Sequence, residues 1–202
     1  MRDEGVIKFH CDWIKTEAAA ESEIEALNHC RNTLFRYGLI GVYSDGIGFG
    51  NISARIKATD QFWISGTQTG HLEQLSACHY ARVTKYSLEE NRVTCEGPVK
   101  ASSESLTHAM IYAMDAGIHA IVHVHHSKLW QTLKYQVPTT AESVPYGTPE
   151  MAAAVRYLYQ HEALRHEKLL VMAGHEDGLI SFGSTVEEAF DLMVRRWKQV
   201  VS

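Results

Sequence analysis

Residues 119–126 read HAIVHVHH, an apolar run in which three of the last four residues are histidines. Side chains alternate between the two faces of a β-strand, so a strand here projects His123 and His125 from the same face. Two imidazoles on one face of a rigid element form half of a Zn²⁺ site. The pattern also fits two polar residues at a strand end, and His126 fits a packed or hydrogen-bonded histidine. We therefore predict a buried strand that carries a candidate half-site for a metal.

Helical and strand patterns alternate along the rest of the chain. Apolar residues recur at helical spacing in four segments that have capping signals. The first predicted helix covers residues 17–37 and is closed by Gly38. The second runs from Ser102 or Ser103 to Gly117, and its apolar stripe consists of Leu106, Ala109, Met110, Ala113 and Met114. A third helix begins at Thr148-Pro149, and a fourth begins with a capping box at 185–188. The predicted strands lie near the end of 41–56, in 61–66, in two parts of 79–95, and in 168–174. Interleaved helices and strands indicate the α/β class, with sheet and helices in layers.

The composition is that of an ordinary globular protein. The 202 residues are 45% hydrophobic and 21% charged, which fits a single domain over residues 1–202. A net charge of −5 and the lack of a basic run argue against binding to nucleic acid or to an anionic membrane. There is no apolar stretch near the roughly 18 residues of a membrane span and no signal-peptide core, so we expect a cytoplasmic protein. The four cysteines form no CxxC pair, which predicts reduced thiols.

A second polar turn supplies candidates for a third metal ligand. The apolar run KLLVMAG at 168–174 leads into HEDG, which offers His175, Glu176 and Asp177. This turn and the histidine pair both follow apolar runs, so both are predicted at the ends of buried strands. Open α/β sheets tend to bind their ligands at such strand ends.

Glu104 is a candidate catalytic residue. It lies in the predicted first turn of the helix that leads into the histidine strand, 19 positions before His123. A helix of about three and a half turns followed by a returning strand brings that first turn back beside the histidines. A glutamate near the start of a helix also interacts favourably with the helix dipole, so the pattern leaves a purely structural role open.

Six motifs in a fixed order resemble the class II aldolase/adducin family. They are GNIS at 50–53, WISGTQTG at 63–70, SSE at 102–104, HVH at 123–125, PYGTPE at 145–150 and HEDGLISFG at 175–183. The resemblance covers roughly residues 17–200 and implies a three-layer α/β/α sandwich with a central, mainly antiparallel sheet. It implies a zinc-dependent aldolase, a lyase that cleaves a phosphorylated ketose through a metal-stabilised enediolate. Epimerase or dehydratase chemistry on the same site, or a non-enzymatic adducin-like binding module, are the alternatives.

The resemblance also assigns roles to individual residues. His123 and His125 correspond to paired zinc ligands, and Glu104 to the acid/base. Three segments correspond to the site for the substrate phosphate: Gly50-Asn51, Ser102-Ser103 and Thr69-Gly70, with Thr67 as an alternative in the third. These segments contain no Lys or Arg, so binding would depend on neutral donors and the start of a helix.

The chain departs from the family pattern at the third histidine, which in the family commonly precedes a glycine. Here Asp177 precedes Gly178, and the histidine lies two positions earlier. Because His175 is the first side chain beyond the apolar strand, we favour it as the third ligand, and Asp177 stays open. The implied cofactor is Zn²⁺, with another divalent metal compatible, and the implied partner is a small sugar phosphate.

The family also implies a homo-oligomer, most simply a tetramer that completes its sites across subunit boundaries. Tyr135, Tyr157 and Tyr159 are candidates for a residue contributed across such a boundary, and no spacing selects one of them.

Overall fold

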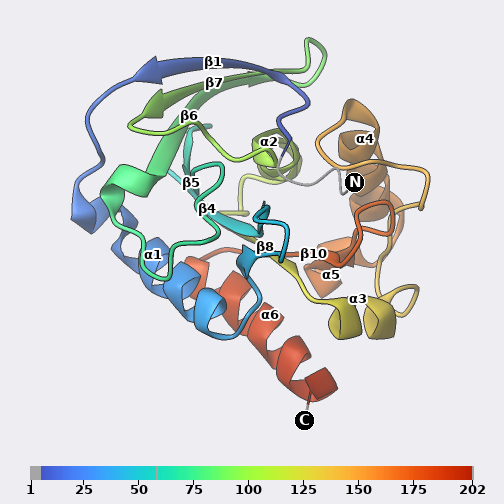
Figure 1. The fold of residues 1–202 in the computed structure, drawn as a ribbon. Coiled ribbons are helices and arrows are strands. Elements are labelled where there is room, and N and C mark those ends of the chain that lie inside the picture. Colours follow the sequence, from blue (N-terminus) through green and yellow to red (C-terminus); the bar gives the residue numbers. More distant parts are fainter. Residues whose placement is uncertain (1–5, 58, 202) are drawn as a thin grey trace.

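The computed structural model describes residues 6–57 and 59–201. Within these residues, eight strands form one sheet in the order β1-β7-β6-β5-β4-β8-β10-β9 (Figure 1). Neighbouring strands are antiparallel except β1 and β7, which are parallel. The strands of this sheet are β1 (His10–Lys15), β4 (Asn51–Arg55), β5 (Phe62–Ser65), β6 (Tyr80–Ser87), β7 (Arg92–Gly97), β8 (Ala120–His125), β9 (Leu169–Val171) and β10 (Gly178–Gly183). A separate small hairpin consists of β2 (Gly41–Val42) and β3 (Gly48–Phe49).

Helices cover both faces of the sheet (Figure 1). They are α1 (Glu21–Arg36), α2 (Ser105–Met114), α3 (Ser127–Leu133), α4 (Pro149–His161), α5 (Leu164–Glu167) and α6 (Val186–Val201), with a short 3-10 turn at Ala77–His79. One hydrophobic core joins α1, α3 and α6 to one face of the sheet, and a second core joins α2 and α4 to the other. The predicted three-layer sandwich with a mainly antiparallel sheet is confirmed.

The alternation of side chains along β8 decides on which face the histidines lie. Val122 and Val124 are buried in the core that contains α1 and α6, whereas Ile121 belongs to the opposite core. His123 and His125 share the face of Ile121, as the two-residue period requires. Burying one aliphatic side chain contributes about 1.5–3 kcal/mol, so a one-residue slip that exchanged the two faces would be strongly unfavourable.

Helix α2 differs from its predicted start. It begins at Ser105 with Glu104 at the N-cap position, so neither Ser102 nor Ser103 caps it, and Glu104 precedes the first turn. The Ser102 hydroxyl instead accepts a hydrogen bond from the Glu104 N–H at 3.3 Å, and the Ser105 hydroxyl donates to the Ser102 carbonyl at 2.6 Å. These short-range bonds hold a tight turn ahead of the helix, which delays its first turn.

The length and burial of α2 also differ from the prediction. Residues 105–112 are all buried, so the helix is enclosed on every side and is not amphipathic. It ends at Met114 with Asp115 as its C-cap, so Gly117 does not close it. The Asp115 carboxylate accepts a hydrogen bond from the Gly117 N–H at 2.7 Å, and this side-chain turn ends the segment. Ala113 of the predicted stripe is exposed because it lies beyond the enclosed part of the helix.

The caps of the two later helices follow the sequence closely. The Thr148 hydroxyl accepts a hydrogen bond from the Met151 N–H at 3.3 Å, which confirms the predicted start of α4. At α6 the Thr185 hydroxyl accepts from the Glu188 N–H at 3.1 Å. The Glu188 carboxylate accepts from the Ser184 N–H at 2.7 Å and not from Thr185, so only half of the predicted capping box forms.

Helix α1 is shorter than predicted at its start and ends as predicted. It begins at Glu21, several residues beyond position 17, because the Glu23 carboxylate accepts a hydrogen bond from the Ala20 N–H at 3.1 Å and fixes the boundary there. Gly38 has a φ of 69°, a left-handed conformation that glycine adopts at little cost, and it follows the last turn of the helix.

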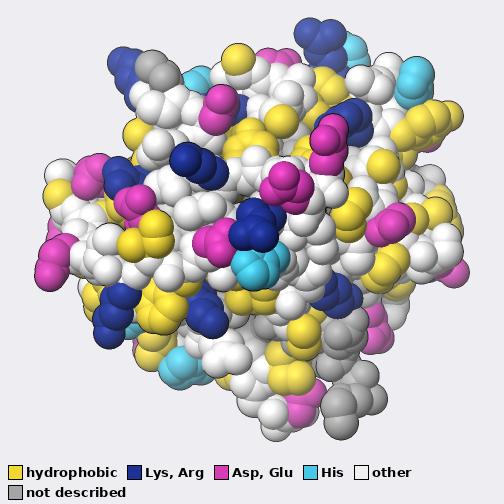
Figure 2. Space-filling model, turned by 90° about the horizontal axis from the view of Figure 1, so that it is seen from above, with side chains coloured by type: hydrophobic (Ala, Val, Ile, Leu, Met, Phe, Trp, Pro, Cys, Tyr) yellow, Lys and Arg dark blue, Asp and Glu magenta, His cyan; other side chains and the backbone are white. Residues whose placement is uncertain are grey.

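The structure bears on three properties that the composition addresses: the distribution of charged side chains, membrane-spanning helices and the cysteines. On the face that Figure 2 shows, basic and acidic side chains are interspersed, and neither sign forms a continuous patch. Among the described residues, no helix combines the length and the apolar character that a membrane span needs. All four cysteines are free thiols, as predicted.

Candidate metal centre

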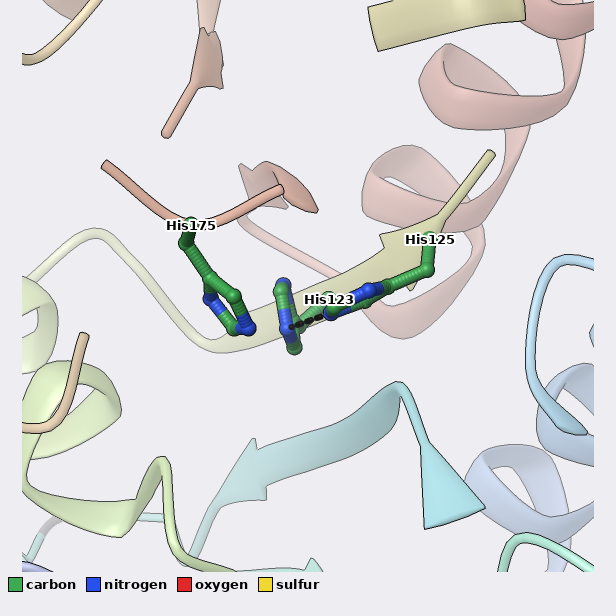
Figure 3. Close-up of side chains that lie close together, drawn as sticks. All are labelled: His123, His125 and His175. Atoms are coloured by element: carbon green, nitrogen blue, oxygen red, sulfur yellow. Dashed lines mark hydrogen bonds between the residues drawn. The ribbon is translucent and has the colours of Figure 1, made fainter. Parts of the chain in front are cut away.

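Three histidines from neighbouring segments form one buried cluster (Figure 3). β8 carries His123 and His125, and His175 lies in the turn that leads from β9 into β10, the strand beside β8. The Nε2 atoms of His123 and His125 are 3.0 Å apart, and one ligating nitrogen from each of the three rings lies within 4.8 Å of the others. Three imidazoles at this spacing are a donor set that suits Zn²⁺ and related transition metals.

Hydrogen bonds orient two of these rings. The Nδ1–H of His123 donates to the Leu179 carbonyl at 3.0 Å, so its Nε2 carries the lone pair that a metal requires. The Nδ1 of His125 is hydrogen-bonded to the Tyr43 hydroxyl at 2.7 Å. Burial, together with the neighbouring His175, holds the pKa of His123 well below its usual range, so this ring is neutral at neutral pH. Both rings therefore present Nε2 towards the centre of the cluster.

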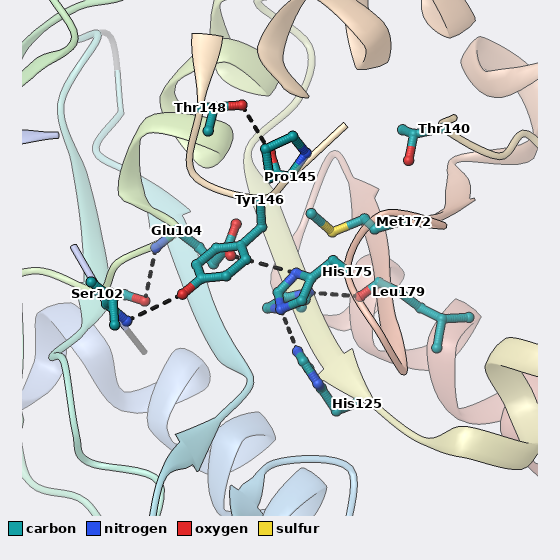
Figure 4. A network of polar contacts seen from close by, with 12 residues as sticks. Ser102, Glu104, His125, Thr140, Pro145, Tyr146, Thr148, Met172, His175 and Leu179 are labelled. Carbon is teal, nitrogen blue, oxygen red and sulfur yellow. Dashed lines mark hydrogen bonds and ion pairs between the residues drawn. The ribbon is translucent and has the colours of Figure 1, made fainter. Parts of the chain in front are cut away.

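Glu104 and Tyr146 complete the surroundings of His175 (Figure 4). The Glu104 carboxylate is 1% exposed, and its Oε1 lies 3.6 Å from Nδ1 of His175. The Tyr146 ring is stacked on the His175 ring with centroids 4.3 Å apart. The structure thus brings the predicted acid/base residue to the edge of the histidine cluster, although Glu104 stands at the helix N-cap and not within the first turn.

The structure separates the two candidates for the third ligand. His175 lies in the cluster, whereas Asp177 is half-buried and takes a left-handed backbone conformation with a φ of 65°. The Asp177 carbonyl accepts a hydrogen bond from the His126 N–H at 3.0 Å. His126 itself is the N-cap residue of α3, with Nδ1 accepting from the Leu129 N–H at 3.1 Å. It is therefore a hydrogen-bonded structural histidine, as predicted.

The three predicted phosphate-binding segments line one pocket. Its lining residues are Gly48, Gly50, Asn51, Gly66, Thr67, Gln68, Thr69, Gly70, Ser102 and Ser103. Asn51 is opposite His123 in the pairing of β4 with β8, and Ser103 directly precedes Glu104, so the pocket adjoins the histidine cluster. Gly50 has a φ of 75°, and a Cβ there would lie 2.8 Å from Ile40, so both conformation and space require glycine. The lining residues include no Lys or Arg.

Several polar residues near the site were beyond sequence-based prediction. Tyr43 comes from the loop between β2 and β3, and no spacing links it to His125. Tyr146 lies inside the PYGTPE motif, which is the one signal that marks it. Among the described residues, the three tyrosines that are candidates for a subunit boundary have no hydrogen bond or ring contact with the histidine cluster. Tyr135 and Tyr157 are 65% and 58% exposed, and the Tyr159 hydroxyl donates to Asp115 at 2.7 Å.

A buried histidine lies one turn beyond Glu104, on α2. Nδ1 of His108 is hydrogen-bonded to the Ser53 hydroxyl at 2.7 Å, and this hydroxyl also lies 2.7 Å from the Tyr112 hydroxyl. Burial lowers the pKa of His108 to about 3, so the ring is neutral. This network ties α2 to β4 and gives His108 partners that the sequence does not reveal.

Comparisons with known proteins agree with this geometry. The family model for the class II aldolase and adducin N-terminal domain matches residues 25–196. No curated protein sequence matches the chain. Among solved structures, YgbL from Klebsiella pneumoniae is 20% identical with a TM-score of 0.66, and the match covers 90% of this chain and 88% of that one. An L-fuculose 1-phosphate aldolase is 18% identical with a TM-score of 0.65 (91% and 84% covered), and a sugar-phosphate aldolase from Thermotoga maritima is 16% identical with a TM-score of 0.66 (89% and 92% covered).

Proposed function

The chain belongs to the class II aldolase and adducin family, and on that premise we propose that it is a metal-dependent aldehyde-lyase that cleaves a phosphorylated ketose. One observation carries the proposal: the Glu104 carboxylate is held 3.6 Å from His175, at the edge of a cluster of three buried histidines. A binding module without catalysis has no need for a buried carboxylate beside a set of metal-ligating rings. We further propose that residues 1–202 form a single domain of this family.

The chemistry of the donor set fits a transition metal, with Zn²⁺ first. His123, His125 and His175 would hold it, because imidazole nitrogen suits Zn²⁺, whereas Mg²⁺ and Ca²⁺ prefer oxygen. Three protein ligands are the number that a catalytic zinc site uses, which leaves a position for substrate. When bound, such a cation supplies a Lewis acid that stabilises negative charge on substrate oxygen atoms.

Glu104 is the proposed acid/base. The turn that Ser102 holds and the enclosed helix that follows fix the backbone of Glu104, and its buried carboxylate lies beside the cluster. A carboxylate in this place takes a proton from the substrate carbon or hydroxyl and returns one to the product. A single acid/base group of this kind contributes about 10²–10⁴-fold in rate.

The adjoining pocket is the proposed site for the substrate phosphate. Gly50-Asn51, Thr69-Gly70 and Ser102-Ser103 offer backbone amides and small hydroxyls, which are the neutral donors that an oxyanion needs. Because Ser103 and Glu104 are consecutive, a phosphate in the pocket places the rest of a small sugar over the carboxylate and the histidines. The substrate class that fits is therefore a sugar phosphate.

We also propose a homotetramer, in which exposed aromatic residues such as Tyr135 and Tyr157 lie at subunit boundaries. Light scattering at working concentration measures the mass directly. A tetramer supports this assembly, and a monomer contradicts it.

The function is tested by metal analysis followed by a screen of ketose phosphates for aldehyde release. Wild type and Glu104→Gln are compared, with Glu150→Gln as control because Glu150 is an exposed carboxylate in the first turn of α4. We expect about one divalent metal per chain in all three proteins, and aldehyde release that only Glu104→Gln loses. Release of an epimer or of water without aldehyde would reassign the reaction to an epimerase or a dehydratase. Absence of bound metal would support an adducin-like binding module.

A further inference from the structure

A buried arginine lies directly behind the proposed phosphate pocket. Arg31, on α1, is 1% exposed. One guanidinium nitrogen donates to the Thr69 carbonyl at 2.9 Å, and the other donates to the carbonyls of Leu72 and Glu73, the latter at 3.2 Å. The guanidinium is therefore hydrogen-bonded to three carbonyls of one loop, which also contributes Thr69 and Gly70 to the pocket.

The charge of Arg31 has no carboxylate partner among the described residues. Its remaining polar contact is the side-chain oxygen of Asn32 at 3.4 Å, and the guanidinium carbon lies 5.2 Å from the centroid of the Phe35 ring. Burial lowers the pKa of Arg31 to about 10, so the group keeps its positive charge at neutral pH. Buried charges are normally paired, so an unpaired cation beside a pocket is suited to an anion that enters from outside the protein.

The Thr69–Gly70 peptide lies between the guanidinium of Arg31 and the pocket. No cis peptide occurs among the described residues, so the carbonyl of Thr69 and the N–H of Gly70 point in opposite directions. Since the carbonyl points at Arg31, the Gly70 N–H points away from it. The nitrogen of Gly70 lies 3.3 Å from where a Cβ on Gly48 would be, and both glycines line the pocket.

The amides of this loop are available to a ligand. Within the described residues, the N–H groups of Gln68, Thr69 and Gly70 donate to no other protein group. Gln68 has a φ of 58°, and successive residues with alternating backbone conformation turn neighbouring N–H groups towards a common point. A loop held by its carbonyls thus presents its amides as an anion site.

We infer that Arg31 is a positioning residue of the phosphate pocket: it fixes the 68–70 amides towards the ligand and supplies the positive charge that the lining residues lack. This inference rests on the proposed function, since it assumes that the pocket binds the substrate phosphate. It specifies the ligand as a dianion, because a fixed unit charge behind the amides favours two negative charges over one.

The test measures binding of inorganic phosphate to the metal-loaded protein by calorimetry. Arg31→Gln removes the charge and most of the hydrogen bonds, Arg31→Lys keeps the charge without the planar fork, and Arg36→Gln is the control on the exposed side of the same helix. We expect about 100-fold weaker phosphate binding for Arg31→Gln and about 10-fold for Arg31→Lys, because charge-assisted contacts are the stronger ones. The control keeps the affinity of wild type, and all four proteins keep their metal.

A pair of anions separates the charge of Arg31 from its support of the loop. Sulfate and methanesulfonate share a tetrahedral sulfur centre and differ by one charge at any working pH. Arg31→Gln should lose more affinity for sulfate than for methanesulfonate, whereas Arg31→Lys should keep the preference for sulfate. If Arg31→Gln lost equal affinity for the two anions, or if phosphate binding were unchanged in both variants, the inference would be overturned while the proposed function stayed intact. Failure of wild type to bind phosphate would overturn both. If Arg31→Gln does not fold, the phosphate affinity of Arg31→Lys decides: an affinity about 10-fold weaker supports the inference, and an affinity equal to that of wild type overturns it.

Discussion

Two histidines separated by only two residues provide a sharp test of the metal centre. His123 has its Nε2 3.0 Å from that of His125, within the cluster. His126 points elsewhere and caps α3 through its bond to the Leu129 N–H. His123→Ala should therefore abolish metal binding, and His126→Ala should leave it unchanged. The comparison is well matched because both changes remove the same side chain from one short segment.

The expected change in stability follows from the thermodynamic linkage between metal binding and folding. A metal that is present at 1,000 times its Kd stabilises the folded state by about 4 kcal/mol. For a chain of this length, 1 kcal/mol shifts Tm by about 2–4 °C, so chelation should lower the Tm of wild type by about 8–16 °C. Loss of the His126 cap costs about 1 kcal/mol, which lowers Tm by a few degrees with and without metal. His126→Ala should thus keep the full chelator-dependent shift.

The assay is metal content per chain together with thermal unfolding with and without EDTA. His123→Ala should contain no metal and show no chelator-dependent change in Tm, whatever the cost of the cavity it creates. His175→Ala carries the same expectation and replaces it if the first variant does not fold. Equal metal content and equal chelator shifts in the His123 and His126 variants would refute the assignment of the ligands.

Three further predictions test the surroundings of the site. Tyr43→Phe removes the hydroxyl that binds His125 and should weaken metal affinity about 10–100-fold in a chelator competition, and unchanged affinity would count against this orienting role. Asp177→Gly relieves the left-handed backbone at a φ of 65° and should raise the free energy of unfolding by up to about 1 kcal/mol in urea, with metal content unchanged; loss of metal would restore Asp177 as a ligand. Hydrogen bonds from Lys168 and Ser184 lower the pKa of Glu188 from 4.5 to about 2, so its stabilising contribution is present above pH 4.5 and lost as the pH falls towards 2. Urea unfolding of Glu188→Gln should accordingly show a weaker loss of stability over that range, and an identical acid dependence would contradict the assignment.

The sequence predicts those parts of the fold that depend on local periodicity. The two-residue alternation in 119–126 is sufficient to place His123 and His125 on one face, and Thr148 with Pro149 is sufficient to start α4. Neither β1, α3, α5 nor β10 follows from the pattern. The pattern predicts no strand for β10, which has a glycine at each end, and its pairing with β8 and β9 defines it in the structure.

The remaining errors concern contacts between elements that are distant in the sequence. Helix α2 has an apolar stripe that reads as amphipathic, yet its polar side chains His108 and Tyr112 are also buried because Ser53 on β4 binds both. The sequence favours His175 as the third ligand, because it is the first side chain beyond the apolar strand, but it leaves Asp177 open. Their separation depends on the backbone of Asp177, which turns left-handed and leaves His175 in the cluster.

The enclosure of α2 has a consequence for how the site is held. Side chains of the two hydrophobic cores pack the sheet that carries the histidines against the helices on both of its faces, including the helix that follows Glu104. A further support comes from residues ahead of the segment that the family model matches. The Val6 N–H donates to the Tyr146 hydroxyl at 3.2 Å, and the Lys8 ammonium lies 3.8 Å from the centroid of the same ring, which is stacked on His175. These contacts support the ring of His175 from the N-terminal side, so we expect the affinity for a metal to depend on this segment as well as on the three proposed ligands.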